Sequence, residues 1–148
     1  MDPLCLYTNT FVYLAKWFLG QPLENCDTVC DKNGLICTEG EFAANNYDVD
    51  SSEEVLALIK ELGGETAAKS CSKGDFPAVP LFNKEDICMY SSGQRIKRPE
   101  KFDCQRVAGP PEDNKQRLCY CHEPSGISIP LLDKFQRIAN IKFLLFHH

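Results

Sequence analysis

The stretch Asn25-Cys26-Asp27-Thr28-Val29-Cys30-Asp31-Lys32-Asn33-Gly34-Leu35-Ile36-Cys37 opens an ordered series of eight cysteines. The series closes with Cys119-Tyr120-Cys121. An even number of cysteines in a compact chain predicts a set of disulfides, and disulfides persist in oxidising compartments. We therefore expect four disulfides from this series: Cys26, Cys30, Cys37, Cys71, Cys88, Cys104, Cys119 and Cys121.

The composition predicts one folded domain with a hydrophobic core. The chain has 148 residues, of which 43% are hydrophobic and 10% aromatic, and this length fits a domain of ordinary size. We expect a small disulfide-rich α+β domain with two or three short helices and a small antiparallel sheet. The sequence divides into an apolar N-terminal segment (1–16), a cysteine-rich module (17–124) and an amphipathic C-terminal tail (125–148).

Two segments carry a helical pattern with clear end signals. Asn25 is a typical N-cap for a helix over 26–33, and Gly34 fits the position after its last turn. The capping box Ser51-Ser52-Glu53-Glu54 begins a second helix, which ends at Gly63-Gly64. An apolar stripe at helical spacing predicts its core face: Val55, Leu58, Ile59 and Leu62.

Short strands and loops account for the other patterned segments. The segment 76–82 is extended and apolar, and its two prolines exclude a helix interior and a central strand. An edge strand over 117–121 places both of its cysteines on one side. Three further strands are predicted, at 35–37, 87–90 and 102–107. Two polar segments are interpreted as loops, at 39–50 and 109–114.

Both ends of the chain are apolar. Residues 4–19 lack the basic start and the cleavage site of a clear signal peptide, and the stretch is short for a membrane span. Three interpretations of residues 4–19 remain: a degenerate signal or anchor, a fragment of a longer chain, and a buried element. We favour the buried element, which would be a helix over 6–18 or a strand. Residues 129–146 fit packing on the domain, docking on a partner or contact with a membrane surface. Cys5 lies outside the series, and we expect a free thiol or an intermolecular link.

Charge is distributed unevenly along the chain. The formal net charge is −5, so nucleic acid is not an expected partner. Residues 1–90 contain 15 of the 21 acidic residues but only 6 of the 16 basic residues. The segment 94–101 is a candidate surface for a sulfated glycan, an acidic protein or an anionic lipid, with a solvated loop as the alternative. Its basic residues are Arg95, Lys97, Arg98 and Lys101.

The sequence contains only weak candidates for catalysis or metal binding. Cys119-x-Cys121-His122, with Cys26 and Cys30, supplies soft ligands for zinc, but the usual C-x2-C knuckles are absent. Adjacent residues of a strand face opposite ways, which separates Cys121 from His122, and a cysteine in a disulfide is no nucleophile. We therefore predict no catalytic residue, no metal and no cofactor, and we favour a protein that is not an enzyme.

Carboxylate pairs and aromatic residues are further candidates for binding. Glu53-Glu54, Asp48-x-Asp50 and Glu85-Asp86 lack the full pattern of a calcium loop, so we interpret them as caps and solvated surface. Three aromatic side chains fit a platform for sugar stacking, although packing in the core explains each more simply. They are Trp17, Tyr90 and Tyr120.

The order of the cysteines and their flanking residues resembles one known module. The run 17–37 has the order W-x2-G-x5-C-x2-V-C-x6-C, single cysteines follow, and 117–121 is R-x-C-x-C. This pattern resembles the cysteine-rich module that accompanies the catalytic domain of the alpha-1,6-mannosylglycoprotein 6-beta-N-acetylglucosaminyltransferases (N-acetylglucosaminyltransferase V). The resemblance covers about two-thirds of the chain. The chain departs from it in a longer segment between Cys37 and Cys71 and in Pro22-Leu23-Glu24.

The resemblance implies an extracytoplasmic accessory module, because the large catalytic domain does not fit in 148 residues. We expect a non-catalytic binding or structural module of the cell exterior or of the Golgi or ER lumen. Its partner would be a protein or a glycan. The alternatives are an accessory part of a Golgi N-acetylglucosaminyltransferase and a subunit that docks through its apolar ends, 1–19 and 129–146. Of the disulfide pairing we expect only that Cys119 and Cys121 reach back to the helix over 26–33 and to Cys37.

Overall fold

A five-stranded sheet forms the framework of the fold. The computed structural model describes residues 15–124. Within them the strands lie side by side in the order β1 (Ala15–Leu19), β5 (Gln116–His122), β3 (Leu81–Phe82), β4 (Cys88–Ser91) and β2 (Ser72–Gly74). The α+β class is confirmed. The expected antiparallel sheet is instead mixed, because β2 and β4 pair in parallel while the other pairs are antiparallel.

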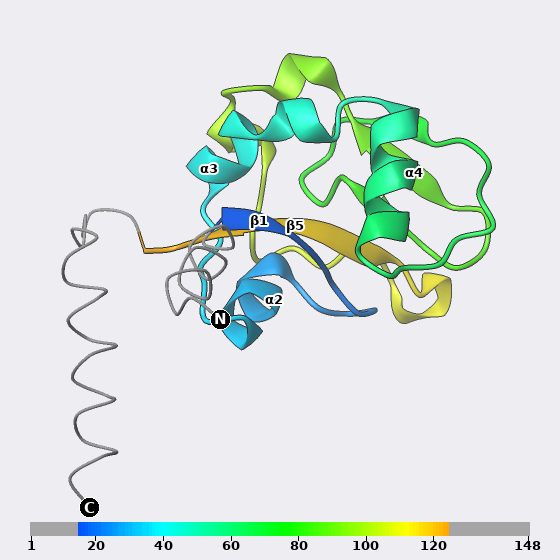
Figure 1. Ribbon diagram of the computed structural model, residues 1–148, viewed down its shortest axis with the longest axis horizontal. Coiled ribbons are helices and arrows are strands. Elements are labelled where there is room, and N and C mark those ends of the chain that lie inside the picture. The colour runs from blue at the N-terminus through cyan, green and yellow to red at the C-terminus, as the bar shows by residue number, and fades with distance from the viewer. Residues whose placement is uncertain (1–14, 125–148) are drawn as a thin grey trace, which may run out of the picture.

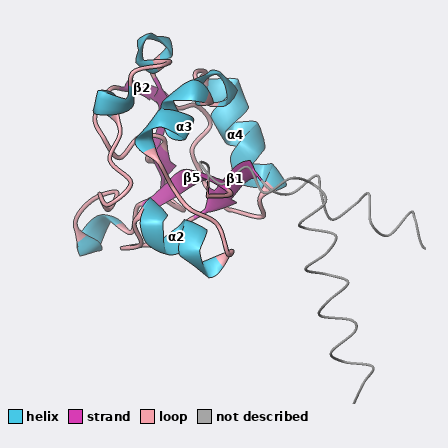
Figure 2. Ribbon diagram, turned by 90° about the vertical axis from the view of Figure 1, so that its left-hand side faces the viewer, coloured by secondary structure: helices cyan, strands magenta, loops and turns pink. Residues whose placement is uncertain are grey.

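Helices cover the β1–β5 part of the sheet on both sides. Figure 1 shows α2 (Cys26–Lys32) on one face of β1 and β5, and α3 (Glu39–Ala44) and α4 (Ser52–Glu61) on the other. The turned view of Figure 2 shows the same layers. As a consequence all seven residues of β5 are buried. Four short 3-10 helices complete the described chain: Asn46–Asp48, Gly93–Arg95, Pro99–Lys101 and Pro111–Asp113.

The two helices predicted with end signals are both present. The Asn25 side chain accepts a hydrogen bond from the Thr28 backbone N–H at 2.8 Å, and α2 is followed by Gly34 with a φ of +71°. The Ser51 hydroxyl accepts from the Glu54 N–H at 3.2 Å, and Gly63 follows α4 with a φ of +80°. These positive φ values explain the glycines, because other residues rarely adopt them.

Four disulfides join the elements. Two of them fix α2 on β5, Cys26–Cys119 and Cys30–Cys121. The other two are Cys37–Cys104 and Cys71–Cys88. All eight cysteines of the series are therefore paired. The expectation that Cys119 and Cys121 reach the N-terminal helix is confirmed, but the pairing of either with Cys37 is wrong.

Residues 15–19 form a strand, which was the alternative to a helix over 6–18. Residues 15–19 pair with β5 along their whole length, with Trp17 opposite Tyr120 and Phe18 opposite Cys119. Gly20 follows directly, and a Cβ on it would lie 3.2 Å from both the Arg117 carbonyl oxygen and a Val29 methyl. The close approach of two neighbouring elements therefore explains this glycine.

The segment 39–50 is a helical region and not the expected loop. Thr38 caps α3, and its hydroxyl accepts a hydrogen bond from the Glu41 N–H at 3.4 Å. Phe42 on α3 is completely buried and packs edge-on against Trp17, with ring centroids 5.4 Å apart. Packing of Phe42 on the sheet thus stabilises a helix of only six residues.

Several predicted strands are displaced or absent. Residues 117–121 belong to β5, which is no edge strand because β1 and β3 flank it. β3 is central although it follows Pro80, because the prolines precede its paired residues. The strand at 87–90 is present as β4. Residues 102–107 form no strand, and 35–37 contribute one isolated bridge, between Ile36 and His122.

The predictions for the two ends of the chain lie mostly outside the described residues. These are the helix over 6–14, Cys5 and the amphipathic tail over 125–148. Within residues 15–124 no helix has both the length and the apolar character needed to cross a membrane.

Candidate functional site

Arg95, the first residue of the predicted basic surface, lies in the core. Its side chain is completely buried, and the planar group lies over the Phe102 ring, 4.1 Å from Cζ to the ring centroid. Its two terminal nitrogens donate four hydrogen bonds, to the Ser91 hydroxyl and to the carbonyls of Phe76, Val79 and Lys101. Burial lowers the pKa of Arg95 to about 10, which leaves the group charged at neutral pH. Arg95 is therefore not exposed to a partner, contrary to the prediction.

Arg117 is a second buried arginine. The sequence pattern placed it in a strand and did not predict its burial. Its guanidinium donates to four backbone carbonyls, those of Ala78 (3.2 Å), Asp103 (2.6 Å), Arg106 (2.8 Å) and Pro77 (3.2 Å). Burial lowers the pKa of this group to about 10 as well. The two arginines together bond all four consecutive carbonyls of residues 76–79. They replace the ladder bonds that this proline-containing segment does not make.

The other three residues of the predicted basic surface remain at or near the surface. Lys97 and Arg98 are exposed and Lys101 is half-buried. The Arg98 guanidinium pairs with the Glu100 carboxylate at 3.0 Å, which offsets one of the three charges. Two of the four predicted basic residues thus remain as unpaired cations among the described residues, which makes this turn a weak candidate site.

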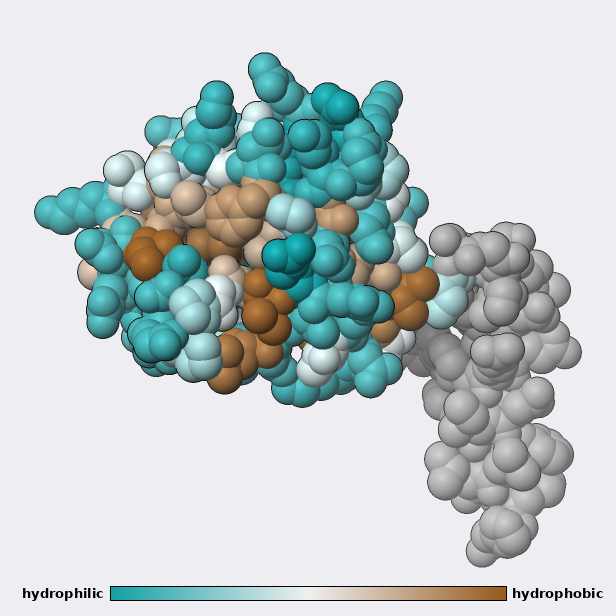
Figure 3. All heavy atoms as spheres, turned by 180° about the vertical axis from the view of Figure 1, so that it is seen from behind, coloured by the Kyte–Doolittle hydropathy of each residue, from teal (hydrophilic) through white to brown (hydrophobic). Residues whose placement is uncertain are grey.

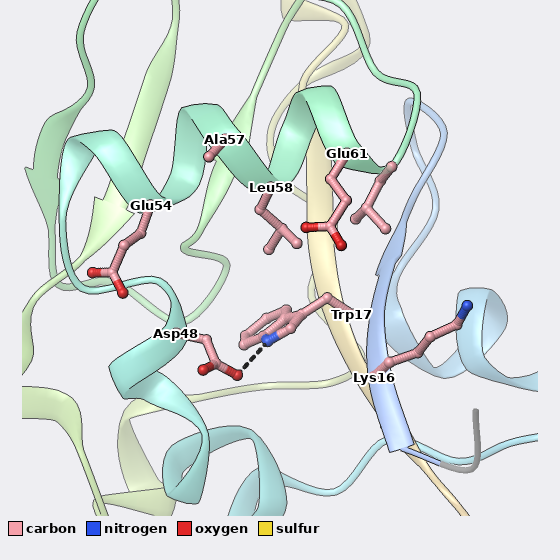
Figure 4. Close-up of a pocket in the computed structure, with 8 residues that line it drawn as sticks. Lys16, Trp17, Asp48, Glu54, Ala57, Leu58 and Glu61 are labelled. Carbon is pink, nitrogen blue, oxygen red and sulfur yellow. Dashed lines mark hydrogen bonds between the residues drawn. The ribbon is translucent and has the colours of Figure 1, made fainter. Parts of the chain in front are cut away.

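A cleft between β1 and α4 is the stronger candidate. We call it the Trp17 cleft; it has a volume of about 540 Å³, within the size range of small-ligand sites. Its lining consists of Lys16, Trp17, Asp48, Glu54, Ala57, Leu58, Glu61 and Leu62. Figure 4 shows Leu58 and Glu61 directed from α4 toward the indole of Trp17, while Lys16 points away from it.

The floor of the Trp17 cleft is held rigidly. Trp17 is only 6% exposed, and its indole N–H donates to the Asp48 carboxylate at 2.9 Å. Its ring packs edge-on against Phe42 and Tyr120, at centroid distances of 5.4 and 5.3 Å. The Trp17 ring therefore packs in the hydrophobic core and also lines the cleft, and these contacts within the fold hold it in position.

The rim of the cleft is acidic. Glu54 and Glu61 project from the α4 face that carries Leu58, and Asp48 lies beside the indole. Among residues 15–124 no cation pairs with the Glu61 carboxylate. The Lys16 ammonium lies 5.1 Å from the centroid of the Phe18 ring, on the same strand.

The carboxylates near the cleft also influence one another. The Ser51 hydroxyl bond lowers the pKa of Glu54, but partial burial and the carboxylates of Asp50 and Asp48 outweigh it. The pKa of Glu54 is therefore raised above its ordinary value. Within residues 15–124 none of these carboxylates takes part in a salt bridge.

The remaining aromatic candidates do not form a platform. Tyr120 is buried beside Trp17, while Tyr90 is half-buried on β4.

Figure 3 shows hydrophobic residues gathered on the face opposite to that of Figure 1, with hydrophilic residues around them. Within the described residues the exposed large hydrophobic residues are Leu23, Tyr47, Phe76, Ile96 and Val107.

The metal and nucleophile candidates are engaged in other interactions. Within residues 15–124 one group of metal-binding side chains converges, Asp27, Cys37 and Cys104, and its two cysteines form a disulfide. The His122 ring bonds the Thr38 hydroxyl through Nε2 at 2.8 Å and the Glu123 carbonyl through Nδ1 at 2.6 Å. His122 therefore links β5 to the start of α3.

The sequence indicated the components of the Trp17 cleft but not their assembly. Trp17 and Glu54 were singled out for different reasons, and Leu58 was assigned to the core. The spacing of Glu54, Leu58 and Glu61 does place them on one helical face. Only the fold shows that this face lies over β1. No protein-family model matches the chain, and no curated protein matches it.

Proposed function

We propose that this chain is a non-catalytic binding module of an oxidising, extracytoplasmic compartment, and that it binds its partner at the Trp17 cleft. The observation that carries the proposal is the pairing of eight cysteines in four disulfides. Such pairing is typical of secreted proteins and of proteins in the Golgi or ER lumen. The cleft supplies the binding surface, with a rigid aromatic floor and an acidic rim.

The chemistry of the described residues supports binding better than catalysis. A disulfide-bonded cysteine offers no thiolate, and both ring nitrogens of His122 are bonded within the fold. The Ser51 hydroxyl beside Glu54 caps α4, and within residues 15–124 no histidine or cysteine lines the cleft. Rigid side chains around a concave surface are, by contrast, what recognition requires.

An accessory role beside a glycosyltransferase is a second proposal, supported by the order of the eight cysteines with Trp17 and Gly20. Titration with UDP-N-acetylglucosamine and with a glycan array tests it, and no binding in either assay would count against it.

A third proposal is docking in a larger assembly through 1–19 and 129–146. It is tested by sedimentation of the chain with and without 129–146. A monomer in both cases would remove it.

Selection of peptides on the folded module tests the main proposal. A random peptide library displayed on phage is selected on the full oxidised chain, and the selected peptides are then measured on two variants. Ala57→Tyr places a bulky side chain in the cleft, while Ala44→Tyr makes the same change at an exposed position of α3 outside it. We expect binding to be lost in Ala57→Tyr and kept in Ala44→Tyr. Equal binding by both variants would contradict the cleft as the site.

A further inference from the structure

The Trp17 cleft has the wrong chemistry for a neutral polar ligand or an anion. Among residues 15–124 its lining contains no amide and no hydroxyl side chain, which are the groups that usually bind neutral polar ligands. Three carboxylates, those of Asp48, Glu54 and Glu61, surround an apolar bed. The single cation of the lining, Lys16, points away from the indole (Figure 4).

Aliphatic and aromatic surface below carboxylates is complementary to the side chains of lysine and arginine. Their methylene stems pack on apolar surface while the charged head stays at the rim. Leu58, Leu62 and Trp17 supply that surface, and the rim supplies the acceptors. An arginine guanidinium would meet one carboxylate with two hydrogen bonds and approach the exposed part of the indole.

The spacing of the carboxylates favours a peptide over a single small amine. Glu54 and Glu61 are seven positions apart on α4, which separates them by about 10 Å along the helix axis. One cation cannot contact both. A peptide in the polyproline II conformation advances about 3.1 Å per residue with three residues per turn, so two basic side chains three positions apart lie on the same side and about 9 Å apart, which matches this separation.

We propose that the Trp17 cleft binds a basic segment of a partner protein, with two lysine or arginine side chains three positions apart seated against Glu54 and Glu61. This proposal rests on the proposed function, because it names the partner chemistry of the same cleft. The raised pKa of Glu54 is consistent with it, since a bound cation relieves the repulsion between neighbouring carboxylates.

Trp17 provides the readout, because it is the only tryptophan of the chain. The oxidised full chain is titrated with the blocked peptide acetyl-Gly-Arg-Ala-Ala-Arg-Gly-amide while the indole fluorescence is recorded. The matched peptide carries glutamine in place of both arginines. Three single variants are compared, Glu54→Gln, Glu61→Gln and the control Glu53→Gln. Glu53 is an exposed acid of the same helix that does not line the cleft.

The proposal predicts a saturable fluorescence change with the arginine peptide and a far weaker one with the glutamine peptide. Each of Glu54→Gln and Glu61→Gln should weaken the arginine peptide about two- to fivefold, as expected for an exposed ion pair, while Glu53→Gln leaves the affinity unchanged. Added salt should weaken binding too.

Other results separate the two proposals. Equal affinity in all three variants, equal affinity for the glutamine peptide, or no saturable change with the arginine peptide would each overturn the basic-segment proposal. The binding function would still stand if phage-selected peptides of other chemistry bind in a way that Ala57→Tyr abolishes. It fails together with the basic-segment proposal if no peptide is selected whose binding depends on Ala57.

Discussion

Replacement of Arg117 by lysine is the most informative test of how this fold is held together. The Arg117 guanidinium donates from three nitrogens to four backbone carbonyls of two separate segments, 77–78 and 103–106. Lysine keeps the positive charge, but its single nitrogen cannot occupy the three positions of the planar fork. We expect at least two of the four carbonyls to lose their donor.

The magnitude follows from those lost bonds. The Pro77 and Asp103 carbonyls also accept backbone N–H groups, so the main cost comes from the Ala78 and Arg106 carbonyls. A buried polar group without a partner costs about 1–3 kcal/mol, so the two together amount to about 2–4 kcal/mol. Typical domains have a free energy of unfolding of about 5–15 kcal/mol, so Arg117→Lys should remove a large part of it. Urea denaturation of the oxidised protein, followed by circular dichroism, measures the difference.

Arg106→Lys is the matched control. Arg106 is exposed and lies 3.7 Å from the Asp103 carboxylate, so the same change there should alter the free energy of unfolding by less than about 0.5 kcal/mol. If Arg117→Lys lowered it by less than about 1 kcal/mol, the assigned role of the guanidinium would be refuted.

Three further predictions concern other parts of the structure. Reduction should abolish near-UV circular dichroism and the thermal transition, because three of the disulfides span 67 to 93 residues and each stabilises by about 2–4 kcal/mol; an unchanged melting temperature would contradict this. Gly20→Ala should lower the free energy of unfolding by about 1–3 kcal/mol in urea, since its Cβ would crowd Arg117 and Val29; a neutral effect would contradict that contact. Because the pKa of Glu54 is raised in the folded state, its ionised form opposes folding; this penalty is complete above the folded pKa, declines as the pH falls through it, and is absent below the unfolded pKa. Glu54→Gln should therefore cost no stability at neutral pH in the same urea assay, and a clear loss would show that the Glu54 charge is stabilising.

Sequence reasoning succeeded where the signals are local. Asn25, Ser51 and the glycines after α2 and α4 identified both helices, because capping depends on residues within one or two turns. The same reasoning missed α3, whose six residues owe their conformation to the packing of Phe42 on Trp17 and Phe102. An acidic, Asn-rich segment gave no sign of that distant contact.

The buried arginines show why the predicted basic surface failed in part. Charged residues are usually exposed, so Arg95 was grouped with its exposed neighbours. Its acceptors include the backbone carbonyls of Phe76, Val79 and Lys101. Every residue has a backbone carbonyl, so the sequence does not indicate which ones will accept a hydrogen bond from a buried arginine. The Trp17 cleft escaped prediction for a similar reason, because its lining comes from β1, from Asp48 and from α4.

Intact mass after alkylation tests most directly whether this chain is a disulfide-stabilised module of an oxidising compartment. The full chain is alkylated without reductant, either folded or in denaturant, and then again after reduction. The four disulfides predict at most one alkyl group before reduction, on Cys5, and nine afterwards. Several alkyl groups on the denatured but unreduced chain would contradict the account.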